Sequence, residues 1–96
     1  MVIHVREVTD AADTSTQGFA LYSALRCAFQ EQHDYIVVSF DGIDAATSSF
    51  VNSSFAALLS DVSLEDIRTR IRVVASTRQI NEMIRRCLKQ KTMLVV

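Results

Sequence analysis

The sequence predicts an α/β fold, a small β-α-β-α-β-α domain with a mostly parallel or mixed central sheet and helices packed against it. Three observations predict this fold. The 96 residues are 49% apolar and 22% charged, which suits a single domain over residues 1–96 with one hydrophobic core. Segments with strand spacing of apolar residues alternate with segments of helical spacing. Residues 35–40 are apolar almost throughout, which is typical of a strand covered on both faces.

The first half of the chain contains two predicted strands and one predicted helix. Residues 2–8 carry valine and isoleucine among polar residues and are predicted to form a strand. A polar stretch follows, and residues 16–32 then have the apolar spacing of an amphipathic helix. The expected apolar positions of this helix are Phe19, Leu21, Tyr22, Leu25, Ala28 and Phe29. Residues 35–40 form the second predicted strand.

A second helix is predicted to begin at Thr47 or Ser48, since either residue is a suitable N-cap. Its expected apolar face consists of Phe50, Val51, Phe55, Leu58 and Leu59. Small residues lie largely off that face, namely Ser48, Ser49, Asn52, Ser53 and Ala56. The exposed side of this helix is therefore predicted to be small and polar.

The last third of the chain is predicted to hold a short helical turn, a strand and a helix. Ser63 begins a capping box with Asp66, residues 71–75 are rich in β-branched side chains, and Ser76 begins a second capping box. The expected apolar face of the last helix is Ile80, Met83, Ile84, Cys87 and Leu88. The apolar residues 94–96 are expected to form an edge strand or a packed tail.

Composition and charge exclude several classes of function. Cys27 and Cys87 are isolated and are expected to be buried thiols of a cytoplasmic protein, with no metal site and no cofactor. No run of residues is long and apolar enough to predict a membrane span or a signal peptide. Residues 61–96 carry eight Lys/Arg and four Asp/Glu but no aromatic residue, which does not favour nucleic acid as a partner.

The basic residues of the last helix allow two interpretations. Either they form a solvated outer face, or they form a surface for an acidic partner. The residues concerned are Arg78, Arg85, Arg86, Lys89 and Lys91.

The segment from Asp41 to Ser49 is the part of the chain in which a functional site is expected. Asp41, Gly42 and Asp44 follow the central strand as a turn, and three hydroxyl residues, Thr47, Ser48 and Ser49, begin the next helix. Hydroxyls at a helix start are caps, or they accept a phosphate that the partial positive charge of the helix end favours. No Gly-rich loop and no pairing of a nucleophile with a base accompanies this segment, so no catalytic residue is predicted.

At these residues the chain resembles a known family. Phe40-Asp41-Gly42-Ile43-Asp44-Ala45-Ala46-Thr47-Ser48-Ser49-Phe50 is similar to the signature of STAS domains, the sulfate transporter and anti-sigma factor antagonist domains. On that signature Thr47 stands at an aspartate, Ser48 at the serine that is phosphorylated and Phe50 at a glycine. The start Thr47-Ser48-Ser49-Phe50 is closer to the STAS-like domain family of unknown function. In the order of elements the resemblance covers about residues 15–90.

The resemblance implies a regulatory function. STAS domains of the bacterial kind bind histidine-kinase-like ATPases that act as anti-sigma factors, and phosphorylation of the serine by that ATPase releases the partner. Carried over, Ser48 is the phosphorylation candidate, with Thr47 and Ser49 as neighbours. The implied partner-binding residues are Asp41, Gly42, Asp44, Thr47, Ser48, Ser49, Asn52 and Ser53.

The sequence therefore favours a non-enzymatic module that binds a protein through the 41–49 turn and the second helix. The alternatives are a structural or oligomerising subunit, including a homodimer, and a nucleotide- or anion-binding unit. Asp41 and Asp44 near a helix start are the residues that suggest this last alternative.

Overall fold

The structure is a computed structural model that describes residues 1–31 and 34–93. Its sheet has three strands in the order β1-β2-β3, and both neighbouring pairs are parallel. The strands are β1 (Val2–His4), β2 (Ile36–Ser39) and β3 (Ile71–Val74). The predicted α/β fold is confirmed, and the central position of the most apolar strand agrees with its sequence.

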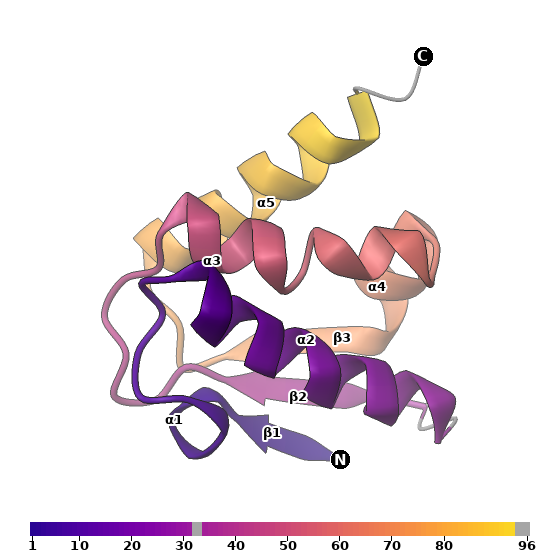
Figure 1. Ribbon diagram of the computed structural model, residues 1–96. Coiled ribbons are helices and arrows are strands. Elements are labelled where there is room, and N and C mark those ends of the chain that lie inside the picture. The colour runs from indigo at the N-terminus through magenta and orange to yellow at the C-terminus, as the bar shows by residue number, and fades with distance from the viewer. Residues whose placement is uncertain (32–33, 94–96) are drawn as a thin grey trace.

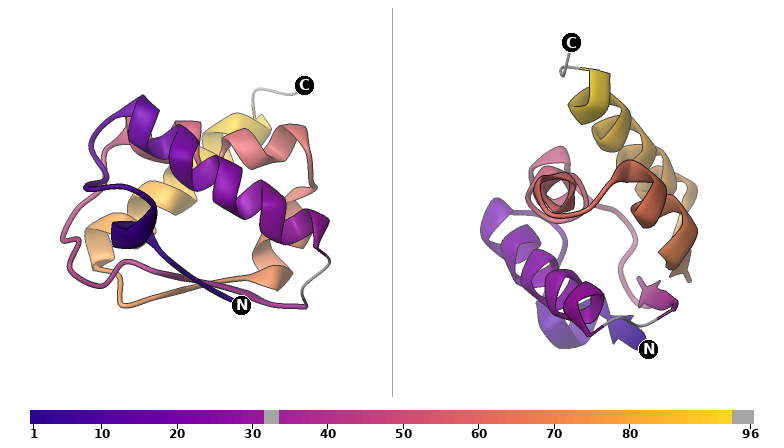
Figure 2. Two further views of the ribbon diagram at one scale, coloured as in Figure 1. Left: turned by 60° about the horizontal axis from the view of Figure 1, so that its bottom comes forward. Right: turned by 90° about the vertical axis from the view of Figure 1, so that its right-hand side faces the viewer.

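Most helices lie above one face of this sheet, whereas the single turn α1 (Val5–Val8) continues from the end of β1 (Figures 1 and 2). The helices above the sheet are α2 (Ser15–Gln30), α3 (Ser48–Ser53), the 3-10 helix η1 (Ala57–Ser60), α4 (Leu64–Arg70) and α5 (Arg78–Met93). Parallel strands added in one direction by right-handed crossovers place their connections on the same face. Ile3 and Val38 are buried beneath the helices, whereas Val2 and Val74 are exposed on the other face. We expected β2 to be covered on both faces, but helices cover only one face of the sheet.

The predicted strand over residues 2–8 is too long. The strand ends at His4, and Val5–Val8 form a single helical turn that Thr9 closes by donating its N–H to the Val5 carbonyl over 2.9 Å. Val5 and Val8 are three residues apart, so one helical turn brings both toward the core, where Val5 is fully buried. In so short a segment, the spacing of the apolar residues fits a strand and a helical turn equally well. The sequence alone therefore does not distinguish the two structures.

Helix α2 matches the predicted helix closely, but its apolar face is rotated from the expected one. Thr14 caps it and forms a capping box with Gln17. The buried residues are Gly18, Leu21, Leu25, Ala28 and Phe29. Phe19 was expected on the apolar face and is instead 62% exposed. Cys27, which was expected to be buried, is exposed as well.

The predicted second helix is interrupted after six residues. Helix α3 ends at Ser53, and the side chain of Ser54 turns back to donate to the Phe50 carbonyl over 2.8 Å. The chain continues through Ala56, which is buried rather than exposed as expected, into η1. Hydroxyl groups that bond to the preceding turn compete with the helical pattern, which accounts for the break.

The last helix begins one residue later than predicted because Thr77, not Ser76, caps it. The Thr77 side chain accepts from the Ile80 N–H, whereas the Ser76 hydroxyl donates to the side chain of Asn81. The other expected cap is confirmed, since Ser63 accepts from the N–H of Asp66 at the start of α4. Cys87 is buried as expected, and this burial raises the pKa of its thiol. The expected tail strand at residues 94–96 lies outside the described residues.

Helices α2 and α3 are in close contact at Gly18. A Cβ atom built on Gly18 would lie 2.3 Å from the Phe50 carbonyl oxygen and 2.8 Å from the Ser53 Cβ. The first contact is with backbone, which cannot rotate away as a side chain can. Only glycine therefore permits this spacing of the two helices.

We expect Gly18→Ala to lower the free energy of unfolding by about 1–3 kcal/mol, the usual cost of overpacking a core. Alanine is intrinsically the better helix former, so an effect in this direction must come from the contact with α3. Urea unfolding followed by circular dichroism measures it, with Thr16→Ala on the exposed side of α2 as the control. Unchanged or increased stability of Gly18→Ala would show that the two helices are not in close contact.

Candidate functional site

The segment from Asp41 to Ser49 leaves the carboxyl end of β2 and rises along one side of the molecule to α3 (Figure 1). Its first turn is closed by the Ile43 N–H, which donates to the Phe40 carbonyl over 2.8 Å. Gly42 has a φ of 82°, in the region that favours glycine, and the side chain of Arg6 covers the place where a Cβ would stand. Ile43 is buried while Asp41 and Gly42 remain exposed.

The middle of the segment is held by hydrogen bonds from the start of α5. The Gln79 side chain makes two bonds to the backbone of Ala46: its Oε1 accepts from the N–H and its Nε2 donates to the carbonyl, each over 2.9 Å. The Thr77 hydroxyl donates to the carbonyl of Asp44 over 2.8 Å. Ala46 is buried, so these bonds satisfy backbone groups that water does not reach. The loop is therefore fixed rather than free.

Thr47 caps α3 and connects it to the residues before α2. Its hydroxyl oxygen accepts from the Phe50 N–H over 3.2 Å and donates its hydrogen to the carbonyl of Asp13 over 2.7 Å. Its own N–H donates to the Ala12 carbonyl over 3.0 Å. The hydroxyl of Thr47 is thus fully used in holding the helix start, and Ser48, the other predicted cap, does not serve as one.

Ser48 is the first residue of α3, and both it and Ser49 are exposed. Among the residues that the structure describes, the Ser48 hydroxyl makes no hydrogen bond. One turn further along, Asn52 is exposed, and the hydroxyl of the half-buried Ser53 donates to the Ser49 carbonyl over 2.8 Å. The outer face of α3 therefore presents small polar groups, as predicted.

All of the predicted site residues reach the surface, but they form a strip rather than a cluster. Asp41 and Gly42 follow the end of β2, and Ser48 is the first residue of α3, with the bonded Asp44 between them in the chain. Phe50, which stands where STAS domains have glycine, is fully buried and does not reach this face. Within the described residues, no group of three His, Cys, Asp or Glu side chains is placed to hold a metal ion.

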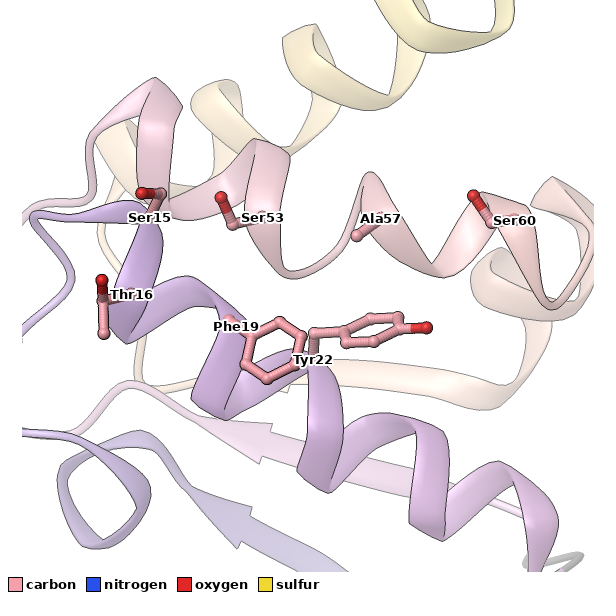
Figure 3. Close-up of a pocket in the computed structure, with 7 residues that line it drawn as sticks. All are labelled: Ser15, Thr16, Phe19, Tyr22, Ser53, Ala57 and Ser60. Atoms are coloured by element: carbon pink, nitrogen blue, oxygen red, sulfur yellow. The ribbon is translucent and has the colours of Figure 1, made fainter.

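Sequence reasoning missed a shallow groove beside this strip, between α2 and the chain of α3 and η1 (Figure 3). It has a volume of about 580 Å³ and is lined by Ser15, Thr16, Phe19, Tyr22, Ser53, Ala57 and Ser60. The Tyr22 hydroxyl donates to the Asp61 carboxylate, which raises the pKa of Tyr22. Phe19 was expected in the core because it has the helical spacing of the apolar residues of α2, but it is exposed and lines this groove.

We expect Gln79→Ala to lower the free energy of unfolding by about 1–3 kcal/mol, because it leaves the buried N–H and carbonyl of Ala46 without partners. Amide hydrogen exchange at residues 43–47 should also accelerate, since the loop loses its attachment to α5. Gln90→Ala, at an exposed position of the same helix, is the control. Unchanged exchange in the loop would mean that Gln79 does not hold it.

Comparison with known proteins agrees with the fold and the signature segment. The family described as a STAS-like domain of unknown function matches residues 17–81, from the first turn of α2 to the first turn of α5. The match includes both the 41–49 segment and Gln79. No curated protein and no solved structure is detectably similar to the chain. No described helix combines the length and apolar character that crossing a membrane requires. The match covers most of the chain, which therefore belongs to the STAS-like domain family of unknown function.

Proposed function

We propose that this domain is a non-enzymatic regulatory module that binds a protein partner through the 41–49 segment and the outer face of α3. The support is structural. Most of the segment is exposed, with only Ile43 and Ala46 buried, and Gln79, Thr77 and Thr47 hold its backbone in place. A surface that is already ordered loses little conformational entropy when a partner binds. The small side chains of Ser48, Ser49 and Asn52 allow close approach of a partner.

Phosphorylation of Ser48 is the proposed switch, and one observation carries this step. Thr47 caps the helix, and the neighbouring Ser48 hydroxyl is exposed and makes no hydrogen bond within the described residues. A phosphoryl group would add about two negative charges in the middle of a docking surface, and a partner that fits the small neutral face would be expelled. The kinase and the partner would be one protein, a histidine-kinase-like ATPase, by likeness to STAS domains. The pair would act in the cytoplasm, where ATP is available.

The burial of Phe50 supports this proposal. On the STAS signature this position is a glycine, and an exposed ring there would obstruct an approaching partner. Phe50 packs inward with the other aromatic core residues, among which Phe40 and Phe55 stack with ring centres 6.3 Å apart. With the Phe50 ring buried, position 50 obstructs the outer face of α3 no more than a glycine would.

Self-association is a second candidate, favoured by the bare face of the sheet. Val2 and Val74 are 55% and 42% exposed on this face, and Tyr35, just before β2, is 54% exposed. A second copy that covered these side chains would remove apolar surface from water. In this case the domain would be an oligomerising subunit and its homodimer the functional unit.

We expect Ser48→Asp to reduce the amount of partner that co-purifies with the tagged chain from its own cells by about tenfold or more, by introducing charge into the docking surface. Ser48→Ala should retain the partner and should lose the phosphate. Quantitative mass spectrometry of the purified complexes measures both.

The matched control is Ser60→Asp, which places the same charge on an exposed serine of η1 outside the proposed surface. Asn52→Arg, one turn from Ser48, should remove the partner and, because the partner is also the proposed kinase, should lower the phosphorylation of Ser48. Equal recovery of every bound protein with Ser48→Asp, Ser48→Ala and Ser60→Asp would contradict the proposal. A homodimer as the sole complex would favour the second candidate.

A further inference from the structure

A second groove lies between α4, β3 and α5, and it shares no residue with the surface proposed above. Its floor is apolar and is formed by Leu64, Val73, Ile84 and Leu88. Arg68, Arg85 and Lys89 also line it, from α4 and α5. The volume is about 520 Å³, enough to receive several side chains. Apolar surface therefore lies directly beside three cationic groups.

The charged residues that line this groove are all cationic. No Asp or Glu is among its lining residues, and Arg68, Arg85 and Lys89 are all exposed. Within residues 1–31 and 34–93, none of these three cations forms an ion pair with a carboxylate. Helix α5 carries five Lys/Arg and one Glu, although the whole chain has a net charge of −1. The groove is thus a region of positive electrostatic potential on a domain whose net charge is nearly zero.

The groove also has a direction and a length. Asn81, Arg85, Leu88 and Thr92 line it at helical spacings of four, three and four residues, so it follows one stripe of α5. At 1.5 Å per residue, this stripe is roughly 16 Å long, the length of about three helical turns. An extended floor with cations along it suits a segment that has apolar side chains on one side and carboxylates beside them.

We propose that this groove binds an acidic amphipathic helix of a partner protein, about three turns long, with leucine-like side chains on the floor and carboxylates facing Arg68, Arg85 and Lys89. The charge complementarity of the cations argues for carboxylates, and the recessed apolar floor argues for inserted side chains. A membrane would need an apolar surface that protrudes, and the groove has no aromatic residue on which a base could stack. The proposal stands independently of the switch at Ser48.

Fluorescence anisotropy with a labelled synthetic peptide tests the proposal. The probe is a peptide of about 16 residues, so that about 11 of them, three helical turns, can lie in the groove between flanking residues. It has leucine on one face of the helix and glutamate on the other. We expect it to bind the full chain, and R85E/K89E to weaken binding by about tenfold or more, because repulsion replaces attraction. Leu64→Asn, which removes apolar floor without changing charge, should also weaken binding. Circular dichroism verifies that each variant is folded.

The matched control is R78E/R86E, which changes the net charge of α5 equally at two exposed positions that do not line the groove. It should bind the probe like the unaltered chain. The proposal is overturned if both double variants weaken binding equally, since the net charge of α5, and not the groove, would then determine binding. It is also overturned if a peptide with scrambled leucines binds as well as the probe, or if duplex DNA or anionic vesicles bind more tightly than the probe.

Discussion

The backbone of α2 rests against the backbone of α3 at Gly18, and the arrangement of the helices above the sheet depends on this contact. The three strands are parallel and in sequential order, so the helices gather on one face and compete for space there. Helix α3 lies among them and packs against both α2 and α5. The absence of a side chain at Gly18 lets α3 come close enough to bury Phe50 and Val51 completely. The side of α3 that remains exposed is then the one with the small polar residues.

The position of the loop before α3 follows from a second interaction. Gln79 pairs with both backbone groups of Ala46 in the manner of a neighbouring strand, although the two residues are 33 positions apart. This pairing connects the first turn of α5 to the proposed docking surface.

Element order and most helix starts could be predicted from the sequence because they depend on local chemistry. The cap Ser63 bonds to a group three residues away, and the apolar run of β2 marks a central strand whatever surrounds it. Phe19 could not be placed correctly, because helical spacing does not show how far the apolar face of α2 is rotated toward α3. The turn at Val5–Val8 was mistaken for strand for a related reason, since two valines three apart fit either structure.

The candidate site was predictable as a segment but not as a geometry. The hydroxyls of Thr47 and Ser48 are equivalent in the sequence, and only the carbonyl of Asp13 and the N–H of Phe50 distinguish them. The bonds from Gln79 and Thr77 join distant residues and leave no local pattern. The basic residues of α5 could be identified in the sequence. The apolar floor of the groove beside them could not, because it depends on Leu64 of α4 and Val73 of β3.

Native mass spectrometry of the chain isolated from its own cells, combined with mapping of phosphorylation sites, tests the proposed role of Ser48 most directly. It separates protein bound to a partner from free protein and reports the phosphate on each. We expect the bound chain to be unmodified and the free chain to carry one phosphoryl group on Ser48. A chain that is unmodified in both populations, or that carries the same fraction of phosphate in both, would contradict the switch.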